Sequence, residues 1–383
     1  MSSKMTQSEA EKEMIKFFGE DTVFFDGNIS TKYDSISTGS PRLDESIGIG
    51  GIPKGRITQF AGQESSGKTM LSLSCIREYL NENPENTALF IDAEYTYDPA
   101  WAEKQGVDTS RVMVIKTNDA RAIFEGLIGK MKINKQTKKS SKSMKGILDH
   151  VIEGTDPRFK NLGIIVLDSI AVLNTPLEIS ADIGKANMAP IPRFLSTELK
   201  KLTPVVAQAN VAFIGINQVR VNIGQMFGDP TSSPGGKALK HACSLMLNMA
   251  PVFSADAVIK NSDNEKIGHT VRAKIQKNKV GAPFRQAEYK IEYEKGMVSF
   301  HEEVFYLSTK YGIITRPTSQ SYMIDGEKVR GADAALSNFV DRGLAEKHSK
   351  VIRDCYIDGV EINAVGDQDC DEEEINPLIG MVS

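Results

Sequence analysis

The sequence predicts an α/β fold in which a mainly parallel, twisted sheet is flanked by helices on both faces. The first observation is that apolar, strand-like runs alternate with helical segments from Ser35 onward. These runs lie at residues 88–91, 112–115, 162–167, 211–216, 245–249 and 271–276. Apolar runs separated by amphipathic helices are typical of a parallel sheet with both faces covered. The second observation is a glycine-rich turn that joins a strand-like run at 56–61 to a helical segment at 70–80.

That turn has every residue of a phosphate-binding loop: Gly62, Gln63, Glu64, Ser65, Ser66, Gly67, Lys68 and Thr69. The two glycines allow the backbone to curl until successive N–H groups point at phosphate oxygens, and the following helix adds its positive N-terminal end. Lys68 would reach the β- and γ-phosphates, and the Thr69 hydroxyl would hold Mg²⁺. A plain turn before a helix is the alternative, but it would not need all four key residues in register. The loop therefore predicts a nucleoside-triphosphate site.

Two carboxylates follow apolar strands at the edge of the predicted sheet where such folds bind ligands. Asp168 ends the strand at 163–167 and would orient Mg²⁺ through Thr69 and water. Glu94 follows the strand at 88–91 and is a candidate base for the attacking water. Either carboxylate could instead cap the next helix, and the complete phosphate loop favours the metal role for Asp168.

Charge and composition limit which partners and which cellular location we expect. The chain has 46 basic and 50 acidic residues, so its total charge favours neither a nucleic-acid nor a membrane partner. No apolar run approaches the ~20 residues of a membrane span and the N-terminus lacks a signal-peptide pattern, so we expect a cytosolic protein with no membrane partner. Residues 130–145 are rich in lysine, which predicts a solvated loop, with a nucleic-acid contact as the alternative.

We divide the chain into four parts. Residues 1–33 contain a short helix at 8–18, which begins with a capping box. The sheet-containing core spans 34–297. A smaller C-terminal α/β domain follows at 298–365, and an acidic tail at 366–383 is expected to be disordered.

Seven segments of the chain closely resemble the RecA family of DNA recombinases and occur in the family's order. They lie at residues 35–40, 64–69, 90–94, 216–220, 226–228, 235–240 and 277–279. The resemblance implies a RecA-like ATPase core with DNA-binding loops, with ATP and Mg²⁺ as cofactors. It also implies that the N-terminal helix docks on the adjacent subunit. The lysine-rich segment at 130–145 has no counterpart in typical bacterial members.

The resemblance implies roles for single residues around the nucleotide. Glu94 would activate the hydrolytic water, and Gln218 would sense the γ-phosphate. Asp98 would contact the edge of adenine and Trp101 would stack on its face, although from the residues alone Trp101 could equally be an aromatic of the core or surface. Pro283 and Tyr293 would help close the pocket around adenine. Lys277 and Lys279 would reach the γ-phosphate bound by a neighbouring subunit.

Two loops, at 181–189 and 219–236, would bind DNA in this resemblance. Glycine-rich loops of this size are more often plain connectors, so the DNA role depends on the family likeness. The residues implied in or beside the loops are Met188, Arg193, Ser196, Lys200, Arg220, Val221, Asn222, Ile223, Phe227, Gly235, Gly236 and Lys237. They offer positive charge, apolar wedges and close backbone approach to phosphates.

The implied function is ATP-dependent homologous recombination. Copies of the chain would form a helical filament on single-stranded DNA, with ATP at the subunit interfaces, and would pair that strand with homologous double-stranded DNA. A ring-shaped hexameric helicase on the same core fold and an ATP-gated scaffold are the alternatives. Lys277 and Lys279, in place of arginines acting in trans, disfavour the helicase, and Glu94 with Gln218 disfavours the scaffold.

Overall fold

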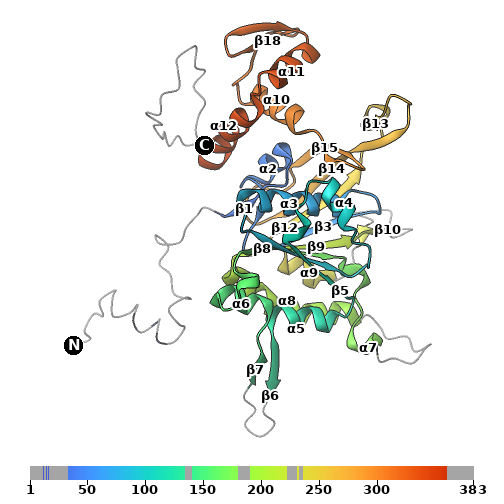
Figure 1. The fold of residues 1–383 in the computed structure, drawn as a ribbon, viewed down its shortest axis with the longest axis vertical. Coiled ribbons are helices and arrows are strands. Elements are labelled where there is room, and N and C mark those ends of the chain that lie inside the picture. Colours follow the sequence, from blue (N-terminus) through green and yellow to red (C-terminus); the bar gives the residue numbers. More distant parts are fainter. Residues whose placement is uncertain are drawn as a thin grey trace. The chain divides into compact units, whose positions relative to one another are not determined.

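A computed structural model describes residues 12, 14, 16, 33–133, 140–179, 190–221, 231–232 and 236–359 (Figure 1). The chain divides into two units, Met1–Asp34 and Ser35–Ser383. In the first unit the described residues of the predicted helix, Lys12, Met14 and Lys16, are helical. The acidic tail at 366–383 lies outside the described residues.

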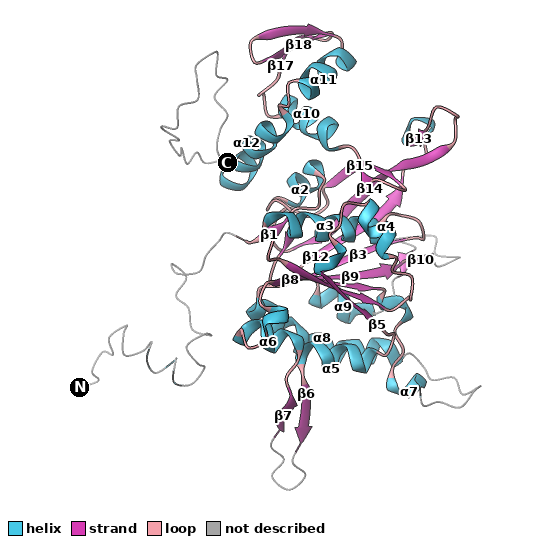
Figure 2. Cartoon of the chain, in the orientation of Figure 1, coloured by secondary structure: helices cyan, strands magenta, loops and turns pink. Residues whose placement is uncertain are grey.

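One large sheet forms the centre of the second unit (Figure 2). Six neighbouring strands run parallel: β12 (Leu245–Pro251), β3 (Ile57–Gly62), β9 (Ala212–Gln218), β8 (Leu162–Asp168), β4 (Thr87–Asp92) and β5 (Val112–Lys116). Antiparallel strands extend the sheet beyond β12: β14 (Lys266–Asn278), β15 (Gln286–Glu292) and β16 (Gly296–Met297), with β13 (Val258–Lys260) paired to β14. The mainly parallel sheet predicted from the apolar runs is confirmed.

Helices cover both faces of this sheet, because successive strand residues point to opposite sides. On one side, buried residues of the sheet such as Phe60 and Phe90 pack with Leu71 and Ile76. The helices of that side are α2 (Pro41–Ile47), α3 (Lys68–Glu82) and α4 (Pro99–Lys104). On the other side, Phe213 belongs to a second core with the helices α5 (Ala120–Ile128), α6 (Ile147–Glu153), α8 (Pro190–Ala209) and α9 (Gly236–Ala242).

The shorter elements complete the second unit. Two small antiparallel pairs lie outside the large sheet: β1 (Ser35–Ile36) with β2 (Ile52–Pro53), and β10 (Arg220–Val221) with β11 (Thr231–Ser232). The four-residue helix α7 (Pro176–Ile179) precedes the first predicted DNA loop. Among the described residues, no helix is long and apolar enough to cross a membrane.

The lysine-rich segment forms a β-hairpin where the structure describes it. Strands β6 (Lys130–Ile133) and β7 (Ser140–Met144) pair antiparallel, so the prediction of a solvated loop is wrong for these residues. The two ends of the hairpin meet at Gly129 and Gly146. A Cβ on Gly146 would lie 2.3 Å from the Gly129 nitrogen, so the close approach requires glycine. Lys142 pairs with Asp149 on α6 and anchors the hairpin to that helix.

The C-terminal elements have a core of their own. They are α10 (Phe300–Lys310), β17 (Thr315–Thr318), β18 (Ser321–Ile324), β19 (Glu327–Arg330), α11 (Ala332–Asp341) and α12 (Ala345–Asp358). The three strands form a small antiparallel sheet. Val304, Phe339 and Ile352 are buried together in this core. The expected small α/β region after the large sheet is therefore present.

A buried carboxylate connects α10 to the start of α2. Ser40, the N-cap of α2, accepts a hydrogen bond from Leu43 N at 3.2 Å and donates to Glu303 Oε2 at 2.5 Å. Glu303 also accepts from Arg42 N at 3.0 Å and from Ser299 Oγ at 2.5 Å. The acid thus lies at the positive end of α2, where negative charge is stabilised.

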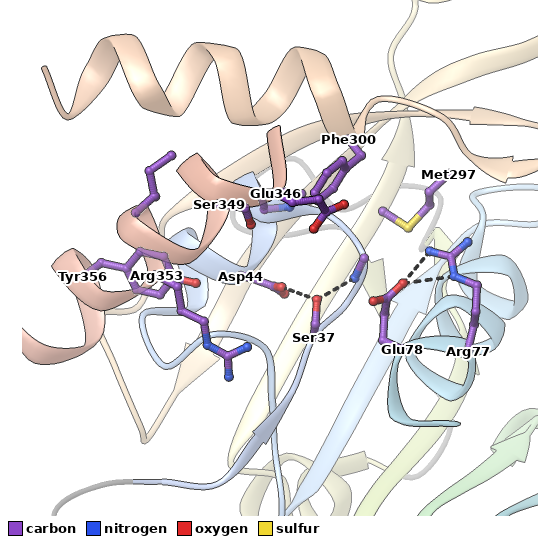
Figure 3. Close-up of a pocket in the computed structure, with 13 residues that line it drawn as sticks. Ser37, Asp44, Arg77, Glu78, Met297, Phe300, Glu346, Ser349, Arg353 and Tyr356 are labelled. Atoms are coloured by element: carbon purple, nitrogen blue, oxygen red, sulfur yellow. Dashed lines mark hydrogen bonds and ion pairs between the residues drawn. The ribbon is translucent and has the colours of Figure 1, made fainter. Parts of the chain in front are cut away.

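A second carboxylate, Asp44, lies buried within α2. It accepts from Ser37 Oγ at 2.6 Å and from Thr38 N and Oγ1 at 2.9 and 2.7 Å. Beside it, a cavity of about 270 Å³ separates α2 and α3 from α12, with Arg77 on one wall and Arg353 on another (Figure 3). We call Asp44, Glu303 and their hydrogen-bond partners the α2 junction.

Candidate nucleotide-binding site

The predicted phosphate loop connects β3 to α3, at the carboxyl edge of the parallel strands. Ser65 and Gly67 have positive φ values of 58° and 82°, the conformation that curls the loop. A Cβ on Gly62 would lie 2.4 Å from the Met249 carbonyl oxygen, so only glycine fits there. Gln63, Glu64 and Ser65 are exposed and Ser66 is buried. Backbone N–H groups of such a curled loop at a helix N-terminus are suited to phosphate.

Lys68 is buried inside this loop. Its Nζ donates to the Gln63 carbonyl oxygen at 2.6 Å and to Ser66 Oγ at 3.3 Å. Burial lowers the pKa of Lys68, and the nearby Asp168 and Glu94 carboxylates partly oppose that shift. The ammonium group is therefore held by the loop itself, close to where phosphate oxygens would bind.

Thr69 and Asp168 come together as the sequence predicted. Thr69 Oγ1 donates to Asp168 Oδ2 at 2.7 Å. Burial raises the pKa of Asp168 to about 6, against the lowering effect of the Thr69 hydrogen bond. A hydroxyl and a carboxylate are ligands that Mg²⁺ accepts, and Mg²⁺ usually takes few protein ligands besides phosphates and water. The described residues contain no cluster of three or more His, Cys, Asp or Glu that could hold a metal ion.

Glu94 lies between the ends of three neighbouring strands. The backbone N–H groups of Ala93 and Glu94 donate to the Asp168 carbonyl oxygen at 2.7 and 3.3 Å, which fixes the turn after β4 against β8. Ser169 Oγ donates to Glu94 Oε1, and Gln218 Nε2 approaches the same oxygen at 3.5 Å. The structure therefore places the candidate base beside the candidate γ-phosphate sensor. Ser169 was not among the residues predicted for the site, and its position directly after Asp168 was the signal that could have identified it.

Trp101 and Tyr293 lie together where the sequence predicts that adenine binds. We call this part of the site the base end. Asp98 caps α4 by accepting from Ala100 N at 2.9 Å and from Trp101 N at 3.4 Å, which is the alternative role of a loop carboxylate. The Trp101 indole donates Nε1–H to the Tyr293 carbonyl oxygen at 2.9 Å. The indole also packs against the core, so its face is only partly available.

Pro283 does not join this group within one chain. It lies in the turn between β14 and β15, where Phe284 N donates to the Ile275 carbonyl oxygen. Tyr293 lies at the other end of the same strand pair, where its N–H donates to Ile267 O. Eight strand residues separate those two positions, or roughly 25 Å.

Lys277 and Lys279 lie away from the phosphate loop of their own chain. Lys277 pairs with Met246 near the start of β12, whereas Met249, at the other end of that strand, pairs with Gly62. Lys277 Nζ donates to the Lys240 and Cys243 carbonyl oxygens at 2.5 and 2.6 Å, at the C-terminal end of α9. Both lysines therefore lie at the opposite ends of the strands from Lys68.

The predicted DNA-binding residues fall into three groups. Arg193 and Lys200 are exposed on α8, Ser196 is half-buried on the same helix, and Gly236 and Lys237 begin α9. Arg220 and Val221 form β10, two residues beyond Gln218. Outside the described residues lie Met188, Asn222, Ile223, Phe227 and Gly235.

The second predicted DNA loop starts at the nucleotide site. Val219 N donates to the Gly62 carbonyl oxygen at 3.1 Å. Gln218, the residue before it, approaches Glu94. The first residue of this loop is thus bonded to the phosphate loop, and the residue before it approaches the candidate base.

Comparison with known proteins agrees with this geometry. A family model described as the RecA N-terminal domain matches residues 5–133 and 136–298. The chain is 34% identical over 357 residues to Protein RecA of Thioalkalivibrio sulfidiphilus, covering 90% of this chain and 94% of that protein. It is 34% identical over 358 residues to Protein RecA of Allochromatium vinosum, covering 92% and 93%. It is 33% identical over 345 residues to Protein RecA of Leptospira meyeri, covering 90% and 79%.

Proposed function

The chain belongs to the RecA family of recombinases, and we propose that it binds and hydrolyses ATP on single-stranded DNA to drive homologous pairing and strand exchange. The observation that carries the proposal is the meeting of Lys68, Thr69, Asp168, Glu94 and Gln218 at one edge of the sheet. Lys68 and Thr69 begin α3, Asp168 and Gln218 end β8 and β9, and Glu94 follows β4. We also propose that the protein works in the cytosol.

The phosphate end of the site has a distinct task for each side chain. Lys68 would leave the Gln63 carbonyl and bind the β- and γ-phosphates. Thr69 and Asp168 would hold Mg²⁺, which when bound neutralises charge on the phosphate oxygens. Glu94 would accept a proton from the attacking water, and the Ser169 hydroxyl would orient the carboxylate for that transfer.

Coupling to DNA would pass through Gln218. Its amide is 3.5 Å from Glu94, so a bound γ-phosphate would compete for the same group. Val219 follows and is bonded to Gly62, and the second DNA loop continues from there. A ligand that orders Gln218 would therefore order the start of that loop, which is a ligand-driven ordering of a segment.

The position of Lys277 and Lys279 supports a site shared between subunits. Both side chains lie at the sheet edge remote from Lys68 of their own chain, so they would serve the γ-phosphate of a neighbour. A contact of this kind repeats head to tail and generates a helical filament when it does not close into a ring. The N-terminal segment at 1–33 would dock on the adjacent subunit in the same filament.

Electron microscopy of the full chain with single-stranded DNA and a slowly hydrolysed ATP analogue tests the proposal. We expect helical filaments, which shorten or disappear without the analogue. Lys68→Ala is the matched control, because it removes the phosphate contact and leaves the DNA-binding residues in place. Closed rings would favour the helicase, and the absence of any DNA-dependent assembly would favour the scaffold.

A further inference from the structure

A second side chain, Gln105, donates hydrogen bonds beside Trp101 at the base end of the nucleotide site. The Tyr293 carbonyl oxygen accepts from the Trp101 indole at 2.9 Å, and Gln105 Nε2 reaches the same oxygen at 3.4 Å. The Gln105 amide donates a shorter bond, 2.9 Å, to the Glu294 carbonyl oxygen. Gln105 and Trp101 are four residues apart, a spacing that brings side chains to one side of a helix. Together they hold two consecutive carbonyls of the turn after β15.

Gln105 is only 3% exposed, and its NH2 group is committed to this turn, whereas its buried Oε1 has no hydrogen-bond partner among the described residues. The turn bends back at Gly296, which has a positive φ of 81°. A Cβ on Gly296 would lie 2.4 Å from Gln105 Oε1, so the glutamine fills the space beneath the turn. A buried amide that loses its partners, or a buried carbonyl that loses its donor, carries a desolvation cost. The local structure therefore depends on this side chain being an amide of this length.

The Tyr293 ring is held from its other end by His269. Tyr293 OH and His269 Nδ1 are 3.3 Å apart, and the ring centroids are separated by 5.7 Å. His269 is 5% exposed, whereas Tyr293 is 38% exposed. The tyrosine side chain is thus partly exposed, with Lys266 Nζ 6.0 Å above its ring centroid, while its carbonyl and its hydroxyl are both held.

We propose that Gln105 is a positioning residue that fixes Tyr293 against Trp101 and so gives the base end its preference for purines over pyrimidines. The inference rests on the proposed ATP-binding function and deepens it. Trp101 is partly buried and Tyr293 is 38% exposed, and the hydrogen bond from the indole to the Tyr293 carbonyl oxygen fixes one aromatic residue relative to the other. A purine has the larger ring system and would gain more than a pyrimidine from stacking on an aromatic side chain held in place.

Loss of the Gln105 side chain should weaken nucleotide binding because the turn would no longer be preorganised. Without Gln105, the turn from Tyr293 to Gly296 would adopt several conformations, and the nucleotide would have to order it on binding. The phosphate end, fixed by other residues, would keep its geometry. A Gln105 variant should therefore change KM for purine triphosphates and leave kcat unaltered.

The test compares hydrolysis of ATP and CTP in the presence of single-stranded DNA. Gln105→Leu has a similar size and no donor; we expect KM for ATP to rise about 5- to 10-fold, kcat to stay within about twofold, and KM for CTP to change little. Gln208→Leu on α8 is the matched control, because Gln208 is exposed and remote from the base end. If Gln105→Leu does not fold, Gln105→Met replaces it, since methionine adapts to irregular surroundings.

Trp101 supplies an independent readout as the chain's single tryptophan. In the wild type, ATP analogue should change its emission more than CTP does, and Gln105→Leu should reduce that difference. An unchanged ratio of KM values and an unchanged fluorescence difference in a folded variant would overturn the inference. Failure of the wild type to hydrolyse ATP with DNA would instead overturn the proposed function, so the two failures are distinguishable.

Discussion

At two places among the described residues, the nucleotide site and the α2 junction, buried or partly buried carboxylates accept hydrogen bonds from hydroxyl groups. At the nucleotide site, Thr69 donates to Asp168 and Ser169 donates to Glu94. At the α2 junction, Ser40 is one of the hydroxyl donors, and it donates to Glu303. The two clusters therefore begin from the same chemistry.

They differ in how fully each carboxylate is satisfied. Glu303 accepts from three donors and Asp44 from three, with every donor on a neighbouring turn or helix end. Asp168 accepts one side-chain hydrogen bond, from Thr69. A carboxylate has about four acceptor positions, so Asp168 keeps capacity for a cation. A structural acid here has most of its acceptor positions filled by protein donors, whereas an acid available to a ligand has most of them unfilled.

The largest expected effect is on hydrolysis at the incompletely satisfied site. Glu94→Gln should lower kcat by 100-fold or more, as expected for loss of a general base at about 10²–10⁴-fold, while ATP affinity stays within about threefold. Lys68→Ala should abolish hydrolysis and weaken ATP binding as well. Steady-state hydrolysis with DNA and equilibrium nucleotide binding check both. A Glu94→Gln protein with wild-type turnover would refute the role of Glu94 as the base.

The α2 junction is complete within one chain, whereas the proposed nucleotide site would be shared between two subunits. Lys277→Gln combined with Lys279→Gln should keep ATP binding and lose hydrolysis. Mixed with Lys68→Ala in equal amounts, it should recover activity at about a quarter of the interfaces, those that combine two intact halves. Hydrolysis assays across mixing ratios measure this, and no recovery at any ratio would count against action in trans.

At the α2 junction the expected effect is on stability. Glu303→Ala leaves Ser40, Ser299 and Arg42 N without their shared acceptor and should lower the free energy of unfolding by roughly 2–4 kcal/mol. ATP hydrolysis at permissive temperature should remain near that of the wild type. Denaturant unfolding measures the first and steady-state kinetics the second. Loss of activity without loss of stability would mean that the junction has a direct role in the site.

The smallest expected effect is the pH dependence, which runs in opposite directions in the two regions. Burial raises the pKa of Glu303 to about 7 from an ordinary 4.5. The folded state therefore binds this proton more tightly than the unfolded state, and stability falls as pH rises from about 5 through 7, by on the order of 2 kcal/mol. Burial raises the pKa of Asp168 to about 6, so activity should fall as pH drops through 6, when the carboxylate is protonated and no longer attracts a cation.

Glu303→Gln is the control for both curves. It should make the fall of stability between pH 5 and 8 smaller, with a remainder from Asp44, whose pKa burial also raises to about 7, and should leave the acid limb of the activity profile where it was. Unfolding curves at several pH values, compared with the wild type, isolate the contribution of this one group. A variant whose stability keeps the wild-type slope would show that Glu303 does not titrate in this range.

The sequence predicted the sheet and the phosphate end because both are encoded locally. Apolar runs mark buried strands, and the glycines, Lys68 and Thr69 are contiguous in the chain. Asp168 and Glu94 could be found since each directly follows such a run. The parallel order of the strands then brings those ends together.

The features that were not predicted depend on contacts between distant segments or on patterns too short to indicate a strand. Gln105 is an ordinary helix residue until the turn after β15 packs over it. Glu303 and Ser40 are 263 residues apart, and their hydrogen bond follows only from the docking of α10 on α2. The β6–β7 hairpin was missed because β6 alternates lysine with apolar residues over only four positions, Lys130–Ile133, and the Ser- and Lys-rich stretch Ser140–Met144 has no alternation that predicts a strand.

The root of that hairpin has a consequence for how the chain can change in length. Gly129 and Gly146 bring the outgoing and returning backbone to one point, so the core meets the same two chain ends whatever lies between them. Lengthening a closed loop costs little, about 0.6 kcal/mol for each doubling. The hairpin is therefore a suitable insertion site. A fluorophore, an affinity tag or a small domain inserted there should leave the geometry of the nucleotide site unchanged.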